Sequence, residues 1–142
     1  MTSDRSTSLV PLAQLLDHRQ RQGKRLSFHI TEDWRQGRTM FGGVLSAVAV
    51  QAMRDLCGHD WPLRALQTNF VGPVSPGAVT VEVTLLRQGK NIRQVKALVL
   101  QADAEGQEQI AGVLLGSFGA SRESKLPTLS PPQVVVANGV ET

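Results

Sequence analysis

The chain contains no tyrosine, a single cysteine, and only four phenylalanines and two tryptophans. One cysteine excludes an internal disulfide and any metal site built from several cysteines. Nucleic-acid-binding proteins usually combine a basic stripe with interleaved aromatic residues, so the shortage of aromatics argues against a nucleic-acid partner. No apolar run reaches the length that crosses a bilayer, and we therefore expect no membrane partner.

The beginning of the sequence also lacks the apolar stretch of a signal peptide. Residues 1–5 are polar apart from Met1 and do not open an apolar stretch of the signal-peptide kind. We therefore expect a cytoplasmic protein. His18 and His59 lie in polar surroundings without metal-ligand spacing, so no metal site is expected.

The composition is that of one soluble globular domain. The 142 residues are 41% hydrophobic and 19% charged, enough to bury roughly two thirds of the unfolded surface. A net charge of +3 suits a small anionic ligand, although an ordinary solvated surface explains it equally well. We expect a polar and amphipathic segment at 1–24, a folded domain at 25–121 and a proline-containing tail at 122–142.

The most informative stretch is the run from Phe41 to Met53, which carries no charge and opens with Gly42 and Gly43. Its length predicts a helix, and a helix that is apolar on nearly every side must be enclosed. The glycines would leave backbone amides bare at the helix start, where an anionic or carbonyl-bearing ligand can bind. Cys57, late in this helix, is expected to be a small buried hydrophobic residue.

Strand patterns surround this helix. Leu26, Phe28 and Ile30 alternate with polar residues before it, as in a half-buried strand. After it, strands separated by turn clusters are expected at 64–71, 79–85, 91–101 and 107–121. On the last of these, Ile110, Leu114 and Phe118 should share a face with Gly112 and Gly116, which would let the sheet curve closely around the helix. The predicted fold class is α+β, one long buried helix wrapped by a curved antiparallel sheet.

Four segments carry a resemblance to a known family: Phe41-Gly42-Gly43, the run 66–73 (LQTNFVGP), the run 85–90 (LLRQGK) and the run 99–101 (VLQ). Their order and placement resemble the hotdog fold and, within it, the N-terminal half of the type II acyl-CoA thioesterases, over about residues 26–121. Members of that family are similar to two hotdog units in one chain. For a single unit the resemblance implies a homodimer that pairs two sheets side by side, with association of dimers left open.

The resemblance implies hydrolysis of an acyl-CoA to free acid and CoA, with coenzyme A as part of the substrate and no separate cofactor. The amide of Gly43, with Gly42 beside it, would hold the oxyanion. The competing interpretation is that the glycines only permit a tight turn or close packing.

The group that positions or deprotonates water is harder to assign. The Asp that many single-unit hotdog thioesterases carry before the helix is absent at positions 38–40. Gln67, Thr68 and Asn69 follow the helix, but alternation puts Gln67 and Asn69 on one face and Thr68 on the other. Asn69, reaching the helix start of the partner, is the preferred water-positioning residue. The alternative is that Asn69 is a polar residue of the sheet whose hydrogen bonds are satisfied there. Asp33 is a candidate base if its loop folds over the cleft, and otherwise a solvated loop charge.

Substrate-binding residues are expected at two further places. Arg87, Lys90 and Arg93 are candidate cations for the CoA phosphates, with a charged hairpin tip as the alternative. Trp34 and Phe41 are candidates for lining the acyl tunnel, with core packing as the competing role of Phe41.

The sequence leaves three functions open. The leading one is an acyl-CoA thioesterase, and the missing carboxylate makes a non-catalytic acyl-CoA-binding hotdog protein a serious alternative. A hotdog dehydratase ranks last, because no His with a carboxylate stands beside Gly42 and Gly43.

Overall fold

A computed structural model describes residues 9–137 of the chain. In chain order its elements are α1 (Leu12–Asp17), β1 (Gln20–Gln22), β2 (Arg25–Ile30), the 3-10 turn η1 (Glu32–Trp34), β3 (Arg35–Gln36), β4 (Thr39–Met40), α2 (Gly42–Cys57), β5 (Leu63–Phe70), β6 (Gly77–Gln88), β7 (Ile92–Ala102) and β8 (Glu108–Gly119).

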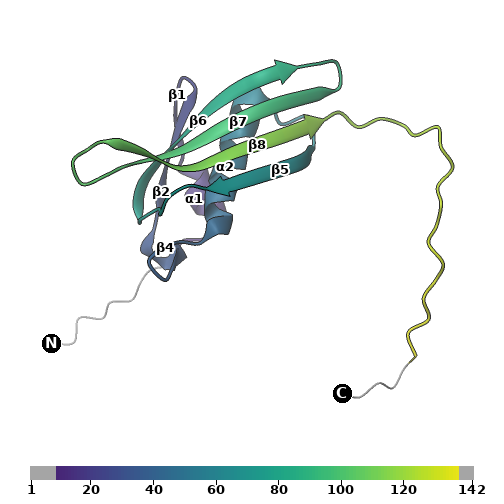
Figure 1. The fold of residues 1–142 in the computed structure, drawn as a ribbon, viewed down its shortest axis with the longest axis horizontal. Helices are drawn as coiled ribbons and strands as arrows, with labels where there is room; N and C mark the ends of the chain where they lie inside the picture. The colour runs from purple at the N-terminus through teal and green to yellow at the C-terminus, as the bar shows by residue number, and fades with distance from the viewer. Residues whose placement is uncertain (1–8, 138–142) are drawn as a thin grey trace.

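Six of the strands form one sheet in the order β1-β2-β6-β7-β8-β5, and every neighbouring pair is antiparallel. The long helix α2 lies against one face of this sheet (Figure 1). Strand β5 follows the helix directly and takes the edge beside β8, so its outer edge has no strand partner among residues 9–137. The predicted α+β architecture is confirmed.

The apolar alternation in the sequence explains how helix and sheet meet. Leu26, Phe28 and Ile30 of β2 are buried, as their alternation predicted. Gly112 and Gly116 of β8 also behave as expected: a Cβ at Gly112 would lie 3.0 Å from Leu45 Cδ2, and one at Gly116 2.8 Å from Met53 Sδ. Missing side chains on β8 therefore let the sheet approach α2 closely.

The prediction for Ile110 is wrong. Leu100 pairs with Ile110 and Val99 pairs with Gly112, so Ala111 is an extra residue in β8. Such a β-bulge reverses the alternation beyond it. Ala111 consequently enters the core, whereas Ile110 is left exposed on the other face.

The helix α2 is enclosed on one side only. The residues that face the sheet are buried: Val44, Leu45, Val48, Ala49, Ala52 and Met53. The predicted enclosure fails along a stripe that includes the exposed Gly43 and the half-buried Ala47 and Val50. Because Ser46, on this same side, contacts Thr68 of β5, the open stripe runs beside the unpaired edge of the sheet.

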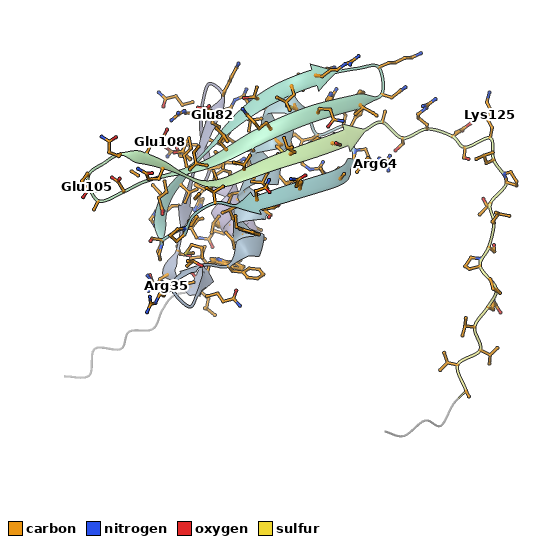
Figure 2. The ribbon with its side chains drawn as sticks, in the orientation of Figure 1. Arg35, Arg64, Glu82, Glu105, Glu108 and Lys125 are labelled. Carbon is orange, nitrogen blue, oxygen red and sulfur yellow. The ribbon has the colours of Figure 1, made fainter. Side chains whose placement is uncertain are left out.

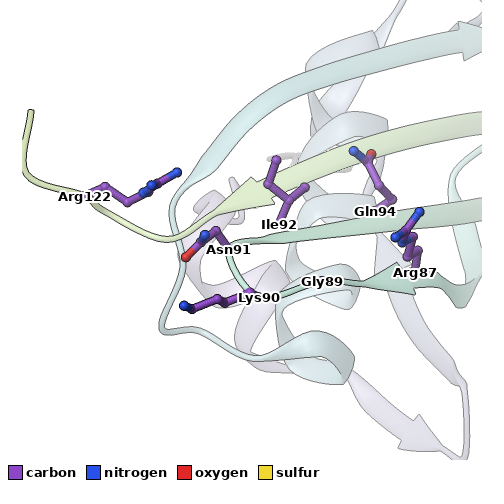
Figure 3. A pocket seen from close by; sticks show the side chains of 7 residues that line it. All are labelled: Arg87, Gly89, Lys90, Asn91, Ile92, Gln94 and Arg122. Atoms are coloured by element: carbon purple, nitrogen blue, oxygen red, sulfur yellow. The ribbon is translucent and has the colours of Figure 1, made fainter.

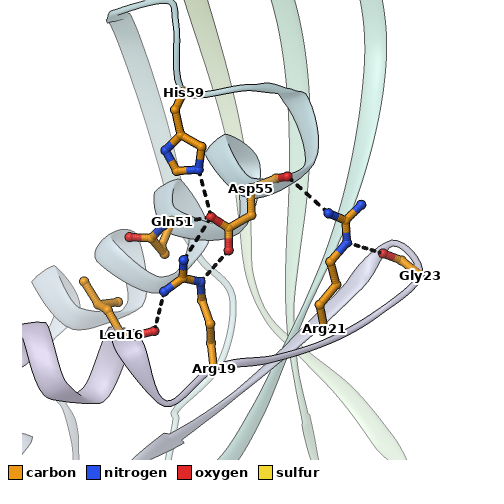
Figure 4. A network of polar contacts seen from close by, with 7 residues as sticks. All are labelled: Leu16, Arg19, Arg21, Gly23, Gln51, Asp55 and His59. Atoms are coloured by element: carbon orange, nitrogen blue, oxygen red, sulfur yellow. Dashed lines mark hydrogen bonds and ion pairs between the residues drawn. The ribbon is translucent and has the colours of Figure 1, made fainter.

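The amino-terminal segment is fastened to the far end of α2 by Asp55 (Figure 4). This carboxylate is 13% exposed and accepts hydrogen bonds from Arg19, Gln51 and His59. Burial raises the pKa of the Asp55 carboxyl, but the hydrogen bonds and the charge of Arg19 together outweigh burial and leave its pKa below the ordinary value. The α1–β1 segment is thereby held against the helix.

The outer face of the sheet is polar near β2, where Arg25 pairs with Glu82 at 2.8 Å and with Glu108 at 3.0 Å. The two glutamates are labelled in Figure 2. After β8, residues 120–137 contain no helix or strand and lead away from the domain (Figure 1). Within residues 9–137, no helix combines the length and apolarity needed to cross a membrane.

Candidate functional site at the start of the long helix

The first turn of α2 presents free backbone donors. Phe41 N–H donates to the Trp34 carbonyl at 2.9 Å, and the Val44 N–H donates to the Phe41 carbonyl at 3.0 Å. Between them, the amides of Gly42 and Gly43 have no backbone acceptor among residues 9–137. These two amides also carry the partial positive charge of the helix amino terminus.

A hollow of about 350 Å³ adjoins this helix start. It is lined by Gln36, Thr39, Met40, Gly42, Leu45, Phe70, Val71, Gly72, Pro73 and Val74. The lining combines apolar side chains with the polar Gln36 and Thr39 and includes no carboxylate. A carbonyl oxygen in this hollow can therefore approach the Gly42 amide without meeting a negatively charged side chain.

Two phenylalanine rings flank the glycines. A Cβ at Gly43 would lie 2.5 Å from Phe41 Cε1, and a Cβ at Gly42 would lie 3.0 Å from Phe70 Cε1. The rings are 48% and 63% exposed, respectively. The glycines therefore both permit close packing and leave free amides. Phe41 lies beside the site and is not part of the buried core.

The hydroxyls of Ser46 and Thr68 meet on the helix side of β5, 3.2 Å apart. As predicted, Gln67 and Asn69 take the opposite face, where Asn69 Nδ2 donates to the Val113 carbonyl at 3.3 Å. Within the subunit, Thr68 therefore shares the face of Gly43, and Asn69 does not. Sequence reasoning missed Ser46, although it is a lone hydroxyl one turn after Gly43 in an otherwise apolar stretch.

Asp33 is part of a clamp on the amino-terminal segment. Its carboxylate accepts hydrogen bonds from the Thr31 hydroxyl and from the Val10 amide, the latter at 2.7 Å. These two bonds hold the pKa of Asp33 below its ordinary value, which weakens it as a general base. Trp34 belongs to the same clamp, because its indole N–H donates to the Val10 carbonyl at 2.9 Å and its ring packs against the core.

A second, basic hollow of about 460 Å³ surrounds the hairpin between β6 and β7. Its lining residues are Arg87, Gly89, Lys90, Asn91, Ile92, Gln94 and Arg122. Figure 3 shows Lys90 and Asn91 at the hairpin tip, Arg122 on the chain that leaves β8, and Arg87 further along, near Gln94. Of the three predicted cations, Arg87 and Lys90 are together, and Arg122 joins them because the Ala120 N–H donates to the Asn91 carbonyl at 2.9 Å.

Arg93 does not belong to this basic hollow. Its guanidinium bonds Asp60 at 2.9 Å and lies 3.9 Å from the centre of the Trp61 ring. Its side chain is only 13% exposed. Arg93 therefore supports the turn after α2, and the sequence-based assignment to phosphate binding does not fit its position.

A third hollow, of about 690 Å³, lies behind the turn that follows β5. It shares Gly72 and Pro73 with the hollow at the helix start, and Pro76, Ala104 and Ile110 contribute apolar surface. Asp103 lies in its wall, and hydrogen bonds from the Gln107 and Glu105 amides and from Gln109 outweigh desolvation and keep the pKa of this carboxyl low. The resulting negative charge makes this hollow unsuitable for phosphate.

Comparisons with known proteins identify the family and the fold. Residues 30–119 match the family described as the acyl-CoA thioesterase N-terminal domain. The chain belongs to this family. No match was found among curated protein sequences.

Solved structures show the fold. A conserved Alicyclobacillus acidocaldarius protein of unknown function, with a hotdog fold, superimposes with a TM-score of 0.72 at 17% identity, covering 92% of this chain and 47% of its own. A Bacillus halodurans protein solved with CoA gives 0.63 at 18% identity, with 79% and 76% covered. A hexameric broad-specificity acyl-coenzyme A thioesterase gives 0.63 at 20% identity, with 73% and 84% covered. The fold is the hotdog fold, and the chain spans about half the length of the first of these proteins.

Proposed function

We propose that this family member hydrolyses acyl-CoA thioesters to a free acid and CoA. The observation that carries the proposal is the pair of free glycine amides at the start of α2, beside a hollow that Gly42 lines. The thioester carbonyl oxygen accepts a hydrogen bond from the Gly43 amide, which strengthens as negative charge develops on that oxygen. Water attacks the carbonyl carbon, the C–S bond breaks, and the departing thiolate of CoA ends as the thiol by taking up a proton.

Thr68 is the better candidate for positioning the attacking water. Its hydroxyl faces α2 and is already held by Ser46, whereas Asn69 lies on the other face of β5. If the sheet continues into a partner, both helices stay on the same face, so Asn69 would also point away from the partner's helix start. Asn69 remains the competing assignment and is tested beside Thr68.

We also propose that the active form is a homodimer joined through β5. This edge strand is eight residues long and has no strand partner among residues 9–137. Leu66 and Phe70 are exposed on its helix side, next to the half-buried Ala47 and Val50 of α2. A long edge with apolar side chains is a surface that folded proteins normally cover.

The basic hollow is the proposed site for the CoA phosphates. Arg87, Lys90 and Arg122 line it, and no carboxylate does. Guanidinium groups suit bidentate contact with phosphate oxygens, and the ammonium adds a point charge. The acidic wall at Asp103 makes the third hollow a place for uncharged parts of the substrate instead.

A second function has one specific observation in its favour. The hollow at the helix start contains no carboxylate to act as a base, which a protein that binds acyl-CoA without hydrolysing it would not need. In that case the glycine amides would hold the thioester carbonyl without activating it.

One experiment separates the two functions: release of free thiol from a panel of short, medium, long and aryl acyl-CoAs. Hydrolysis predicts turnover on at least one substrate, with Thr68→Val losing most of it and Asn69→Ala retaining it. The opposite order of the two variants would return the water-positioning role to Asn69. Binding of the CoA esters without thiol release by the wild-type protein would instead establish the binding function.

A further inference from the structure

The turn between β5 and β6, residues 71–76, forms one wall of the hollow at the helix start. The run from Phe70 to Val74 lines that hollow. The same turn is tied to the chain that enters α2, because the Met40 N–H donates to the Val74 carbonyl at 2.9 Å. Only Phe41 stands between Met40 and the glycine pair. The position of this turn therefore determines both the shape of the hollow and the approach of the chain to the free amides.

The turn is held at its beginning by the bulge of β8. It forms no helix or strand, and Pro73 and Pro76 have no backbone N–H to donate. The Val71 and Gly72 amides both donate to the Ala111 carbonyl, at 2.9 and 3.0 Å. The part of the turn between the two prolines lies beyond this anchor, so its support must come from another element.

Gln101 of β7 supplies that support. Its Oε1 accepts a hydrogen bond from the Ser75 N–H at 2.9 Å, and its Nε2 donates to the Ser75 carbonyl at 2.8 Å and to the Ala78 carbonyl at 3.3 Å. The last backbone pair between β6 and β7 on this side is Thr80 with Leu100. One side-chain amide thus pairs with both backbone groups of Ser75, as a neighbouring strand would do.

Gln101 is connected to the glycine pair through this turn. Its side chain lines the third hollow and not the hollow at the helix start. Two steps lead from it to the helix: Gln101 holds Ser75, and the adjacent Val74 carbonyl holds the Met40 N–H. Release of Ser75 would therefore loosen the wall of the hollow together with the residues that lead into α2.

We propose that Gln101 is a positioning residue for the thioester site. By fixing Ser75 it holds the turn 71–76 against the helix start, where the thioester carbonyl meets the glycine amides. This inference rests on the proposed acyl-CoA hydrolysis. It deepens that proposal, because the placement of the carbonyl then depends on a β7 side chain that lies outside the helix-start hollow.

Gln101→Met tests this role, because methionine has a similar length and no comparable donor or acceptor. A misplacement of about 1 Å in a site can cost about 100-fold in rate, so we expect kcat for the best acyl-CoA substrate to fall between about tenfold and 100-fold. KM should change by less than about twofold, because the basic hollow proposed for the CoA phosphates is untouched.

The matched control is Gln51→Met. Gln51 is also half-buried, and its side-chain amide donates a hydrogen bond to Asp55 at 2.9 Å near the far end of α2. Losing this bond should lower the melting temperature and leave kcat unchanged well below the unfolding transition. A kcat loss in Gln101→Met no greater than in Gln51→Met would reduce Gln101 to a structural role and overturn the inference.

Gln101→Glu makes the test reversible within one protein, which keeps it valid if Gln101→Met does not fold. An ionised glutamate offers no donor to the Ser75 and Ala78 carbonyls, whereas the protonated acid has one O–H donor and one carbonyl acceptor. These carbonyls and Asp103, the charged residue in the lining of the same hollow, disfavour ionisation and raise the pKa of the introduced carboxyl above its ordinary value of about 4.3.

The kcat of Gln101→Glu relative to wild type should therefore rise between about pH 8 and about pH 5. The relative kcat of Gln101→Met should stay constant over the same range. A flat ratio for Gln101→Glu would show that the hydrogen bonds to the turn do not govern turnover, and it would overturn the inference.

Hydrogen exchange of the Met40 amide reports on the turn without any turnover. If the wild type releases no thiol from any substrate, the proposed hydrolysis fails separately, and this measurement decides the positioning role. Faster exchange of the Met40 N–H in Gln101→Met than in Gln51→Met supports it, because that N–H is bonded to Val74 of the turn. Equal exchange in the two variants contradicts it.

Discussion

Substitution of Gly43 by alanine tests the helix-start site most directly. The new Cβ would lie 2.5, 3.0 and 3.2 Å from three ring carbons of Phe41. The ring must move, and it can, because it is 48% exposed. Since alanine favours a helix over glycine by up to about 1 kcal/mol, we expect the cost of displacing the ring to be largely offset and the melting temperature to change by less than about 4 °C.

Activity should respond far more strongly than stability. The methyl group and the displaced Phe41 ring occupy the space through which a carbonyl oxygen approaches the Gly43 amide. Loss of one oxyanion donor typically lowers kcat by about 10²- to 10³-fold. We therefore expect thiol release from the best acyl-CoA substrate to fall by at least about 100-fold in kcat/KM.

A double variant identifies the cause of the loss. In Phe41→Ala/Gly43→Ala the ring is absent, so recovered activity would assign the loss to the ring and continued inactivity to the methyl group itself. Gly43→Ala with wild-type kcat/KM and an unchanged melting temperature would refute the oxyanion role of this amide.

Three further predictions concern stability and binding. Asp55→Asn should lower the free energy of unfolding by about 1–3 kcal/mol at pH 7, as measured by urea titration. The pKa of the Asp55 carboxyl in the folded protein lies below its ordinary value. The difference between the two proteins should therefore be present above about pH 4 and disappear as the pH falls further. Gly112→Ala should cost about 1–3 kcal/mol by the same measurement, since its Cβ would meet Leu45 at 3.0 Å; an unchanged value would contradict the close packing of β8 on α2. Arg93→Ala should lower the melting temperature and leave KM for acyl-CoA unchanged, whereas Lys90→Ala should raise KM with little effect on stability, and the reverse pattern would restore Arg93 to the phosphate site.

The fold could be predicted from the sequence because its strongest patterns are local. The uncharged run after Phe41 and the glycine at position 58 predicted the two ends of α2. The alternation of apolar and polar residues predicted which side chains of β2 face the core. The bulge at Ala111 could not be predicted, because an inserted residue leaves the local apolar pattern unchanged and is defined only by pairing with β7. The incompletely buried stripe on α2 depends on how far the sheet extends beside the helix. The local sequence of the helix does not contain that information.

The candidate site was predicted only in part. Alternation correctly separated Thr68 from Asn69, but their contacts were unknown until the strand was placed beside Ser46. The same alternation, applied to β7, would have put Arg93 on the inner face with Val95, away from Gln94. Arg122 carried no signal, because it follows the last strand and reaches the basic hollow only through the path of the chain after β8.

The clamp formed by Asp33 and Trp34 on Val10 has a practical consequence for work on this protein. The same η1 segment supplies the Trp34 carbonyl that receives the Phe41 N–H, so Val10 is mechanically connected to the entrance of the proposed thioester site. Trimming the chain to begin at Leu12, a natural choice for crystallisation, would remove the donor and the acceptor that Val10 provides. Measurements on such a shortened protein would describe a site whose supporting η1 segment has lost two hydrogen bonds.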